Sequence, residues 1–127
     1  MSKLVRDKVK DVLADKQVEF RNALPGDRKS LLSKKLLEEV GELIFSHNSE
    51  SVRQEAADVI EVVLSLAEAY GVGRMEVSIE VSQKREGRGG YDNLVVMDFV
   101  DARPSPAVGS SLHSRDYFRF DGPGYSG

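Results

Sequence analysis

The 127-residue chain contains no cysteine and only two histidines, His47 and His113. Without cysteine, disulfide bonds and thiolate metal sites are excluded. Neither histidine stands three residues after a glutamate or an aspartate. The Glu-x-x-His pattern of di-iron helical bundles is therefore missing, and a metal site in this chain would have to be built from oxygen ligands.

Long hydrophobic runs are also missing. No stretch approaches the roughly 18–20 apolar residues that a membrane-spanning helix needs, and the opening sequence MSKLVRDKVK has no apolar core of the kind found in signal peptides. We therefore expect no membrane partner and a cytoplasmic location. The cysteine-free composition is compatible with a reducing cytosol.

Basic residues are scarce in the middle of the chain. Residues 36–83 carry ten acidic and two basic residues, whereas residues 1–35 carry five acidic and ten basic ones, and the net charge is −3. A nucleic-acid backbone is gripped by a basic stripe, which an acidic centre does not supply, so we expect no nucleic-acid partner. The same distribution suits a cation with an anionic ligand beside it.

The pattern of apolar residues predicts an all-α protein, a small four-helix bundle in a single domain over residues 1–101. The expected helices cover about residues 5–17, 28–47, 51–70 and 74–86. Ser51 and Gln54 form the sequence pattern of a capping box, and Gly71 suits the position just after a helix. The apolar stretch NLVVMDFV predicts a short strand or extended segment. Residues 102–127, rich in serine, proline and glycine, predict a flexible tail.

Two of the expected helices carry carboxylates close to apolar faces. At 100° per residue, Glu39 borders the apolar stripe of its helix and Glu42 lies one step outside it, while Glu55 lies within an apolar arc bordered by Asp58. A solvated surface is the ordinary explanation for the EEVGE stretch alone. A carboxylate on a buried face, however, costs several kcal/mol if it is ionised and unpaired. Protonation, a lysine or arginine partner, or a cation can offset that cost. All-oxygen ligands favour Mg²⁺, with Mn²⁺ as a substitute.

Four stretches together resemble the all-α nucleoside triphosphate pyrophosphohydrolases, the MazG-like superfamily. The family's Glu-Glu-x-x-Glu and Glu-x-x-Asp motifs correspond to EEVGE (Glu38–Glu42) and EAAD (Glu55–Asp58). The flanking KLVRDKV and KREGRGGYD resemble blocks of a branch similar to phosphoribosyl-ATP pyrophosphohydrolase. The resemblance covers about residues 3–99, and it departs from the family pattern at Lys10 and Tyr91.

The resemblance implies Mg²⁺-dependent hydrolysis of a nucleoside triphosphate to the monophosphate and pyrophosphate, in the house-cleaning of non-standard or surplus nucleotides. It also implies a homodimer or a dimer of dimers. Glu38 and Glu39 would be the catalytic acids, with Glu38 orienting or deprotonating the attacking water. The metal ligands would be Glu39, Glu42, Glu55 and Asp58, and the phosphates would be bound by Lys84, Arg85, Arg88, Lys3 and Arg6.

Two other functions are compatible with the sequence. The first is phosphoribosyl-ATP pyrophosphohydrolase itself, although the blocks at residues 3–9 and 84–92 favour the house-cleaning branch. The second is a non-catalytic helical module that forms oligomers or binds nucleotides and keeps the acidic site for a structural ion. Metal-dependent melting without metal-dependent turnover would distinguish this module from an enzyme.

Overall fold

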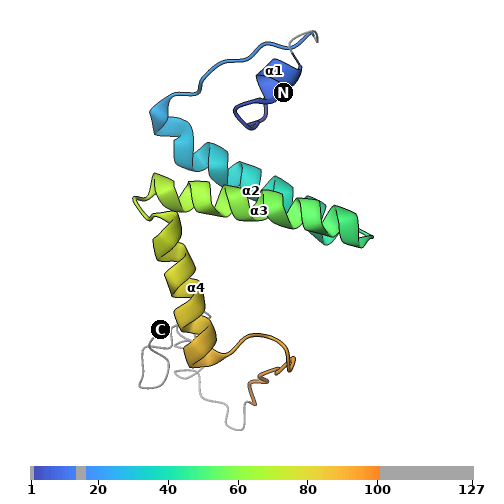
Figure 1. Cartoon of the computed structure of the whole chain (residues 1–127), viewed down its shortest axis with the longest axis vertical. Helices are drawn as coiled ribbons and strands as arrows, with labels where there is room; N and C mark the ends of the chain where they lie inside the picture. Colours follow the sequence, from blue (N-terminus) through green and yellow to red (C-terminus); the bar gives the residue numbers. More distant parts are fainter. Residues whose placement is uncertain (1, 14–16, 101–127) are drawn as a thin grey trace. The chain divides into compact units, whose positions relative to one another are not determined.

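The computed structural model describes residues 2–13 and 17–100, and over these residues it is all-α, as predicted, with four α-helices and no strand (Figure 1). The helices are α1 (Val9–Val12), α2 (Arg28–Ile44), α3 (Ser49–Ala69) and α4 (Arg74–Arg88), and a short 3-10 helix, η1 (Pro25–Asp27), precedes α2. The chain divides into two compact units, Met1–Val77 and Ser78–Gly127. The predicted tail at 102–127 lies outside the described residues.

The first unit is built on an antiparallel hairpin of α2 and α3, which lie side by side in Figure 1. Leu36, Val40 and Leu43 recur at intervals of four and three on α2, and Val59, Val62 and Leu66 do so on α3. Val62 is buried and the other five are half-buried. Hydrophobic burial between these two stripes therefore holds the hairpin together.

The ends of the hairpin are fixed by local hydrogen bonds. At its open end, Tyr70 and Gly71 end α3 in a Schellman motif, because Gly71 N donates to Glu68 O (2.9 Å) and Val72 N donates to Ala67 O (3.0 Å). Gly71 has φ +80°, the left-handed conformation that glycine adopts at little cost, which confirms its predicted place after the helix. The Lys29 ammonium lies 4.2 Å from the ring centre of Tyr70 and joins the start of α2 to the end of α3.

The predicted capping box at the start of α3 is wrong. The helix begins two residues earlier, at Ser49, and its N-cap is Asn48, whose side chain accepts a hydrogen bond from Ser51 N at 2.8 Å. Asparagine is at least as good an N-cap as serine. The side-chain oxygen of Asn48 accepts from the backbone amide of Ser51, which would need a different acceptor if Ser51 were itself the N-cap. Helix α2 also ends three residues earlier than expected, at Ile44, so the turn between α2 and α3 has four residues rather than the expected three.

Two other helices differ in length from the prediction. Helix α1 is four residues long rather than the expected thirteen or so, since short helices with little apolar surface to bury are marginal in water. Helix α4 continues two residues further than expected, through Arg88, with basic residues in its last turn, where they complement the helix dipole. Gly89, with φ +81°, follows it.

The stretch after α4 is extended rather than a paired strand. A turn closes with Leu94 N donating to Tyr91 O at 3.2 Å, and residues 95–100 follow without strand pairing to any residue that the structure describes. The β-branched and apolar residues there predicted a strand or extended segment, and among the described residues they form no paired strand. No helix of the described residues is long and apolar enough to cross a membrane.

The assignment of the α3 cap predicts the outcome of two substitutions. Asn48→Ala removes the acceptor for Ser51 N and is expected to lower the free energy of unfolding by about 1 kcal/mol. Ser51→Ala leaves the backbone donor in place and is expected to change it by less than about 0.5 kcal/mol. Urea unfolding followed by circular dichroism measures both. A larger loss in Ser51→Ala than in Asn48→Ala would contradict this assignment.

Candidate metal centre

Three of the four predicted metal ligands meet between α2 and α3. Glu39 and Glu42 on α2 and Glu55 on α3 each bring one carboxylate oxygen within 4.8 Å of the others. Glu39 and Glu42 are three residues apart and therefore neighbours on one side of α2, and the antiparallel packing of the hairpin brings Glu55 against them. We call Glu39, Glu42 and Glu55 the acidic cluster.

Two members of the acidic cluster each have one buried carboxylate oxygen without a hydrogen-bond partner. Glu39 is only 6% exposed, and its Oε2 and that of Glu55 are buried without a hydrogen-bond partner. An ionised carboxylate oxygen that is buried and unpaired is costly, so native structures usually give it a donor or a cation. The acidic cluster therefore has what an oxygen-ligated divalent cation requires: several carboxylates, free lone pairs and partial shielding from water.

The charges of the acidic cluster act on one another. Burial raises the pKa of Glu55, and so do a hydrogen bond with Glu42 and the negative charges of Glu42, Asp58 and Glu39. Without a cation, one proton is thus held at the cluster more strongly than on a free glutamate. A divalent cation bound there would replace that proton.

Lys35 is a member of the site that the sequence reasoning missed. Its ammonium lies 3.1 Å from Glu39 Oε1 and 3.3 Å from Glu38 Oε1, and its side chain is largely buried. Burial on its own would lower the pKa of Lys35, but the hydrogen bonds to Glu39 and Glu38 raise it above its usual value. Lys35 therefore occupies one oxygen of Glu39 and leaves the other to the acidic cluster. The spacing of three and four residues to these acids was the signal for this contact in the sequence.

Glu38, the residue predicted to activate water, pairs with two lysines. Besides Lys35 it pairs with Lys3 Nζ at 3.3 Å. Burial acts to raise the pKa of Glu38, but the hydrogen bonds from Lys35 and Lys3 outweigh it and lower the pKa. Glu38 is therefore held ionised, next to the acidic cluster in sequence but outside it in space.

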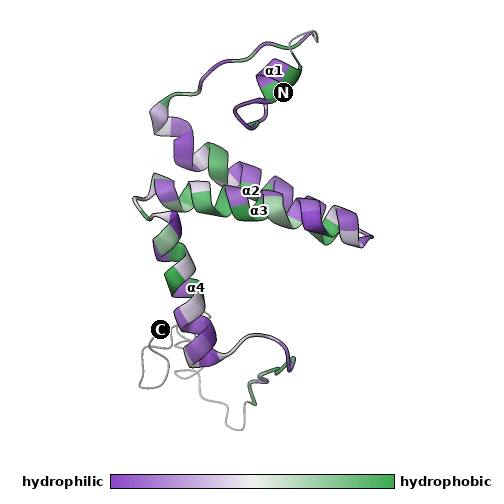
Figure 2. Cartoon of the chain, in the orientation of Figure 1, coloured by the Kyte–Doolittle hydropathy of each residue, from purple (hydrophilic) through white to green (hydrophobic). Residues whose placement is uncertain are grey.

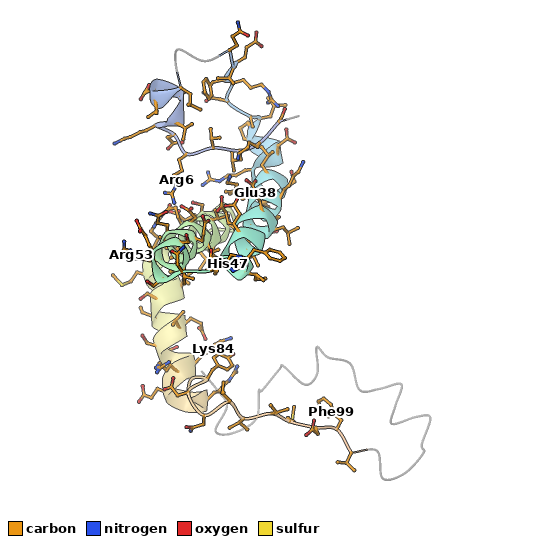
Figure 3. The ribbon with its side chains drawn as sticks, turned by 90° about the vertical axis from the view of Figure 1, so that its right-hand side faces the viewer. Arg6, Glu38, His47, Arg53, Lys84 and Phe99 are labelled. Carbon is orange, nitrogen blue, oxygen red and sulfur yellow. The ribbon has the colours of Figure 1, made fainter. Side chains whose placement is uncertain are left out.

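Asp58, the fourth predicted ligand, is bound by Arg6. Arg6 Nη2 donates to Asp58 Oδ1 at 2.6 Å, so the N-terminal segment, residues 2–8, is tied to α3. Figure 3 shows Arg6 reaching from this segment toward α3, with Glu38 on the neighbouring α2. The structure thus brings together Glu39, Glu42 and Glu55 and gives Asp58 a cationic partner beside them.

A cavity of about 650 Å³ adjoins this site. The N-terminal segment, η1, α2 and α3 enclose it, and Glu39, Asp58 and Arg6 belong to its wall, so it opens onto the predicted metal ligands. Its volume is typical of small-molecule sites, about 300–1,000 Å³. The apolar part of its lining consists of Leu4, Val5, Ala23, Leu24, Pro25, Leu31, Leu32 and Val62.

Arg74 and Glu61 border the same region. Both terminal nitrogens of Arg74 donate to the carboxylate of Glu61, which lines the cavity, and Arg74 Nε lies 3.8 Å from Glu68. The hydrogen bond from Arg74, against a smaller effect of burial, lowers the pKa of Glu61. Glu61 is therefore committed to Arg74, which fixes the start of α4 and leaves Glu61 outside the acidic cluster.

The other predicted phosphate-binding residues, Lys84, Arg85 and Arg88, lie in the second unit, near the end of α4. Arg85 Nη2 lies 3.6 Å from Asp92 Oδ2, and its guanidinium packs over Gly90. A Cβ at Gly90 would come within 2.5 Å of Arg85 Nη1, so the glycine leaves room for the guanidinium. The KREGRGGYD stretch therefore forms the end of α4 and a turn that leaves room for the Arg85 guanidinium.

The charge of the acidic cluster predicts how Glu55→Gln changes stability. Because the folded-state pKa of Glu55 is raised, the folded chain binds a proton more tightly than the unfolded chain. Its stability therefore falls as the pH rises from the unfolded pKa through the folded one. The amide cannot ionise, so metal-free Glu55→Gln is expected to melt a few degrees above metal-free wild type at pH 7.5, with the difference vanishing toward pH 4.

Thermal melts in EDTA and in Mn²⁺ measure this effect. Mn²⁺ should raise the melting temperature of the wild type but not that of Glu55→Gln, because the variant lacks a metal ligand. Loss of a ligand should weaken metal binding by more than the roughly 10- to 100-fold that is typical of losing an outer-shell partner. Glu68→Gln, an exposed change on the same helix, should behave as wild type. If Glu55→Gln melted below wild type in EDTA at every pH, Glu55 would instead stabilise the fold through its own contacts.

Comparisons with known proteins assign no function to the site. No family model matches the chain, and neither does any curated protein or solved structure. What the acidic cluster can do therefore follows from its carboxylates, their burial and their charged neighbours.

Proposed function

We propose that the chain is a Mg²⁺-dependent nucleoside triphosphate pyrophosphohydrolase of the MazG-like type, acting in the cytoplasm on non-standard or surplus nucleotides. The observation that carries the proposal is the meeting of Glu39, Glu42 and Glu55 from the two motif helices, with buried carboxylate oxygens that lack partners. Acidic motifs on two helices are common in sequences. Their convergence on one point, partly shielded from water, is what a cation site needs.

The acidic cluster would bind the cation through Glu39, Glu42 and Glu55, with Asp58 able to join as a fourth ligand. Four carboxylates match the preference of Mg²⁺ and Mn²⁺ for oxygen, and their combined negative charge is the reason that a divalent cation is favoured over a monovalent one. When bound, the cation would neutralise negative charge on the triphosphate and make its bound water more acidic. Lys35 holds the far oxygen of Glu39 and so keeps its Oε2 available to the cation.

In the proposed reaction, water attacks phosphorus and the oxygen bridging the α and β phosphates leaves with the pyrophosphate. One phosphorus–oxygen bond forms, one breaks, and the water gives up a proton. Glu38, ionised and one residue from Glu39, is the proposed acceptor of that proton, and Glu39 is the alternative. The five basic residues Lys3, Arg6, Lys84, Arg85 and Arg88 are proposed to bind the phosphates, since lysine and arginine match phosphate oxygens.

The cavity beside the acidic cluster is the proposed place for the nucleoside. It has apolar walls for a base, and it has carboxylates, two arginines, a lysine and Ser65 for polar contacts. It also shares Glu39 and Asp58 with the metal site, so a nucleoside in it would place its phosphates by the cation. This adjacency favours a nucleotide over a free metal ion or an isolated phosphate as the natural ligand.

A second copy of the chain is the proposed partner, as a homodimer or a dimer of dimers. An apolar face made of Leu37, Ile44, Val52, Ile60 and Val63 is left uncovered on the hairpin, with Leu37 76% and Ile60 59% exposed. Hydrophobic residues, green in Figure 2, occur along both helices. Among the described residues, Val62 is the one apolar residue that is buried, and it keeps 9% exposure. A hairpin with so little core of its own is stabilised when a matching face covers it.

Helical geometry separates the apolar face from the site. Leu37 lies about 160° around α2 from Glu39, and Ile60 lies about 160° around α3 from Asp58. Because α2 and α3 are antiparallel, these two sides of the helices fall on the same side of the hairpin. Two hairpins can therefore pack through their apolar faces while both cavities stay open to substrate.

The activity is tested by measuring the products formed from a panel of standard and modified nucleoside triphosphates with Mg²⁺. Wild type is expected to release pyrophosphate and the nucleoside monophosphate. Glu39→Gln and Glu55→Gln should each lower the rate by about 100-fold or more, since each removes a ligand of the cation. Glu68→Gln is the matched control and should keep the wild-type rate.

The products decide between the proposal and its alternatives. Release of orthophosphate in place of pyrophosphate would contradict the proposed bond cleavage. No turnover on any triphosphate, with Mg²⁺ still raising the melting temperature, would favour the non-catalytic module. Turnover of phosphoribosyl-ATP alone would place the chain in histidine biosynthesis.

The dimer is tested by Ile60→Glu. A charge in the centre of a covered apolar face costs several kcal/mol, so the dissociation constant should rise by about 100-fold or more in sedimentation equilibrium. Val12→Glu places the same charge on an exposed residue of α1 and should leave the mass unchanged. A wild type that sediments as a monomer at every concentration would refute the dimer.

A further inference from the structure

The ion pair between Arg6 and Asp58 is the contact that ties the N-terminal segment to the motif of α3. The two residues are 52 positions apart, and the bond is short, at 2.6 Å. Both side chains keep access to solvent, with Arg6 59% and Asp58 35% exposed. The pair can therefore break and re-form without opening the hydrophobic stripes of the hairpin.

Asp58 lies at the border of the acidic cluster. It follows Glu55 by three residues and so lies on the same side of α3. Its charge contributes to the raised pKa of Glu55, and it shares the cavity wall with Glu39. Arg6 thus pairs with a carboxylate whose charge acts on the acidic cluster but which is not a member of it.

A cation in the acidic cluster and a guanidinium on Asp58 are in conflict. Both are positive, and Asp58 lies one helical turn from Glu55, so each weakens the hold of the other. Arg6 also lines the cavity, where it can turn its donors toward a ligand. Lys3, another basic residue of the segment, pairs with Glu38. Glu38 is not a member of the acidic cluster, so a cation bound there does not compete with Lys3.

We propose that Arg6 and a divalent cation compete for Asp58, and that binding of the cation releases Arg6 to a phosphate group of the ligand in the cavity. The first half stands on the geometry of Arg6, Asp58 and the acidic cluster. The second half rests on the proposed function, which supplies the phosphate ligand. Arg6 is then the residue that couples cation binding to anion binding, and each strengthens the other.

The competition is tested by titrating Mn²⁺ into the full chain by calorimetry. Arg6→Ala removes the competitor and is expected to tighten Mn²⁺ binding by roughly two- to fivefold, the range of an exposed ion pair. In the Asp58→Asn background the same change should have no effect, because the contested carboxylate is gone. Lys10→Ala removes an equal charge near the segment and should match wild type.

The release is tested with inorganic pyrophosphate as the probe, at a fixed concentration of free Mn²⁺ and again in EDTA. With Mn²⁺, Arg6→Ala is expected to weaken pyrophosphate binding by about tenfold, the effect of losing a charge-assisted hydrogen bond. In EDTA it should change the binding by less than twofold, since Arg6 is then committed to Asp58. Arg6→Lys should keep part of the coupling.

The outcomes separate the inference from the proposed function. Weaker Mn²⁺ binding in Arg6→Ala, or equal loss of pyrophosphate affinity with and without Mn²⁺, would overturn the exchange at Asp58 and leave the enzyme proposal standing. A wild type that binds no Mn²⁺ at all would overturn both. Tighter Mn²⁺ binding that depends on Asp58, together with a metal-dependent loss of pyrophosphate, would support the exchange.

Discussion

The repulsion among the carboxylates that meet between α2 and α3 is the constraint on which the rest of the site depends. Glu39 is buried with one oxygen unpaired, and it faces Glu42 and Glu55 across a distance at which like charges oppose each other strongly. Protein stability of about 5–15 kcal/mol leaves little room for such an arrangement without a purpose. A proton relieves it in part, as the raised pKa of Glu55 indicates. A divalent cation relieves it more completely.

The basic residues around the site follow from that constraint. Lys35 takes one oxygen of Glu39, Lys3 and Lys35 hold Glu38, and Arg6 takes Asp58. Of the acidic cluster, these pairs occupy only Oε1 of Glu39, and the buried Oε2 atoms of Glu39 and Glu55 keep no hydrogen-bond partner. The surrounding cations thus reduce the net charge of the region while keeping its centre negative. A site arranged in this way attracts a cation and, around it, presents the donors that an anionic ligand needs.

Much of the hairpin was predictable from the sequence because local periodicity determines it. The apolar stripes of α2 and α3 and the glycine after α3 are properties of neighbouring residues, and so is the convergence of Glu39 with Glu42. The cap of α3 was mispredicted because Asn48 and Ser51 are both good caps and packing of the turn decides between them. The Arg6–Asp58 pair was out of reach, since 52 residues separate its members and their meeting depends on how residues 17–27 return the chain to α2. Lys35, by contrast, was visible at helical spacing and was overlooked.

The two sides of the hairpin differ in the kind of contact that they suit. One side carries the carboxylates, the cavity and the N-terminal segment, and the other carries exposed leucine, isoleucine and valine. The apolar side carries none of the carboxylates that a cation would need beside a phosphate ligand. If the acidic side were the dimer contact, it would bury like charges against their own copies, at a cost that no exposed ion pair offsets. Each side therefore suits only one role, and the same two helices can serve both because their faces point in opposite directions.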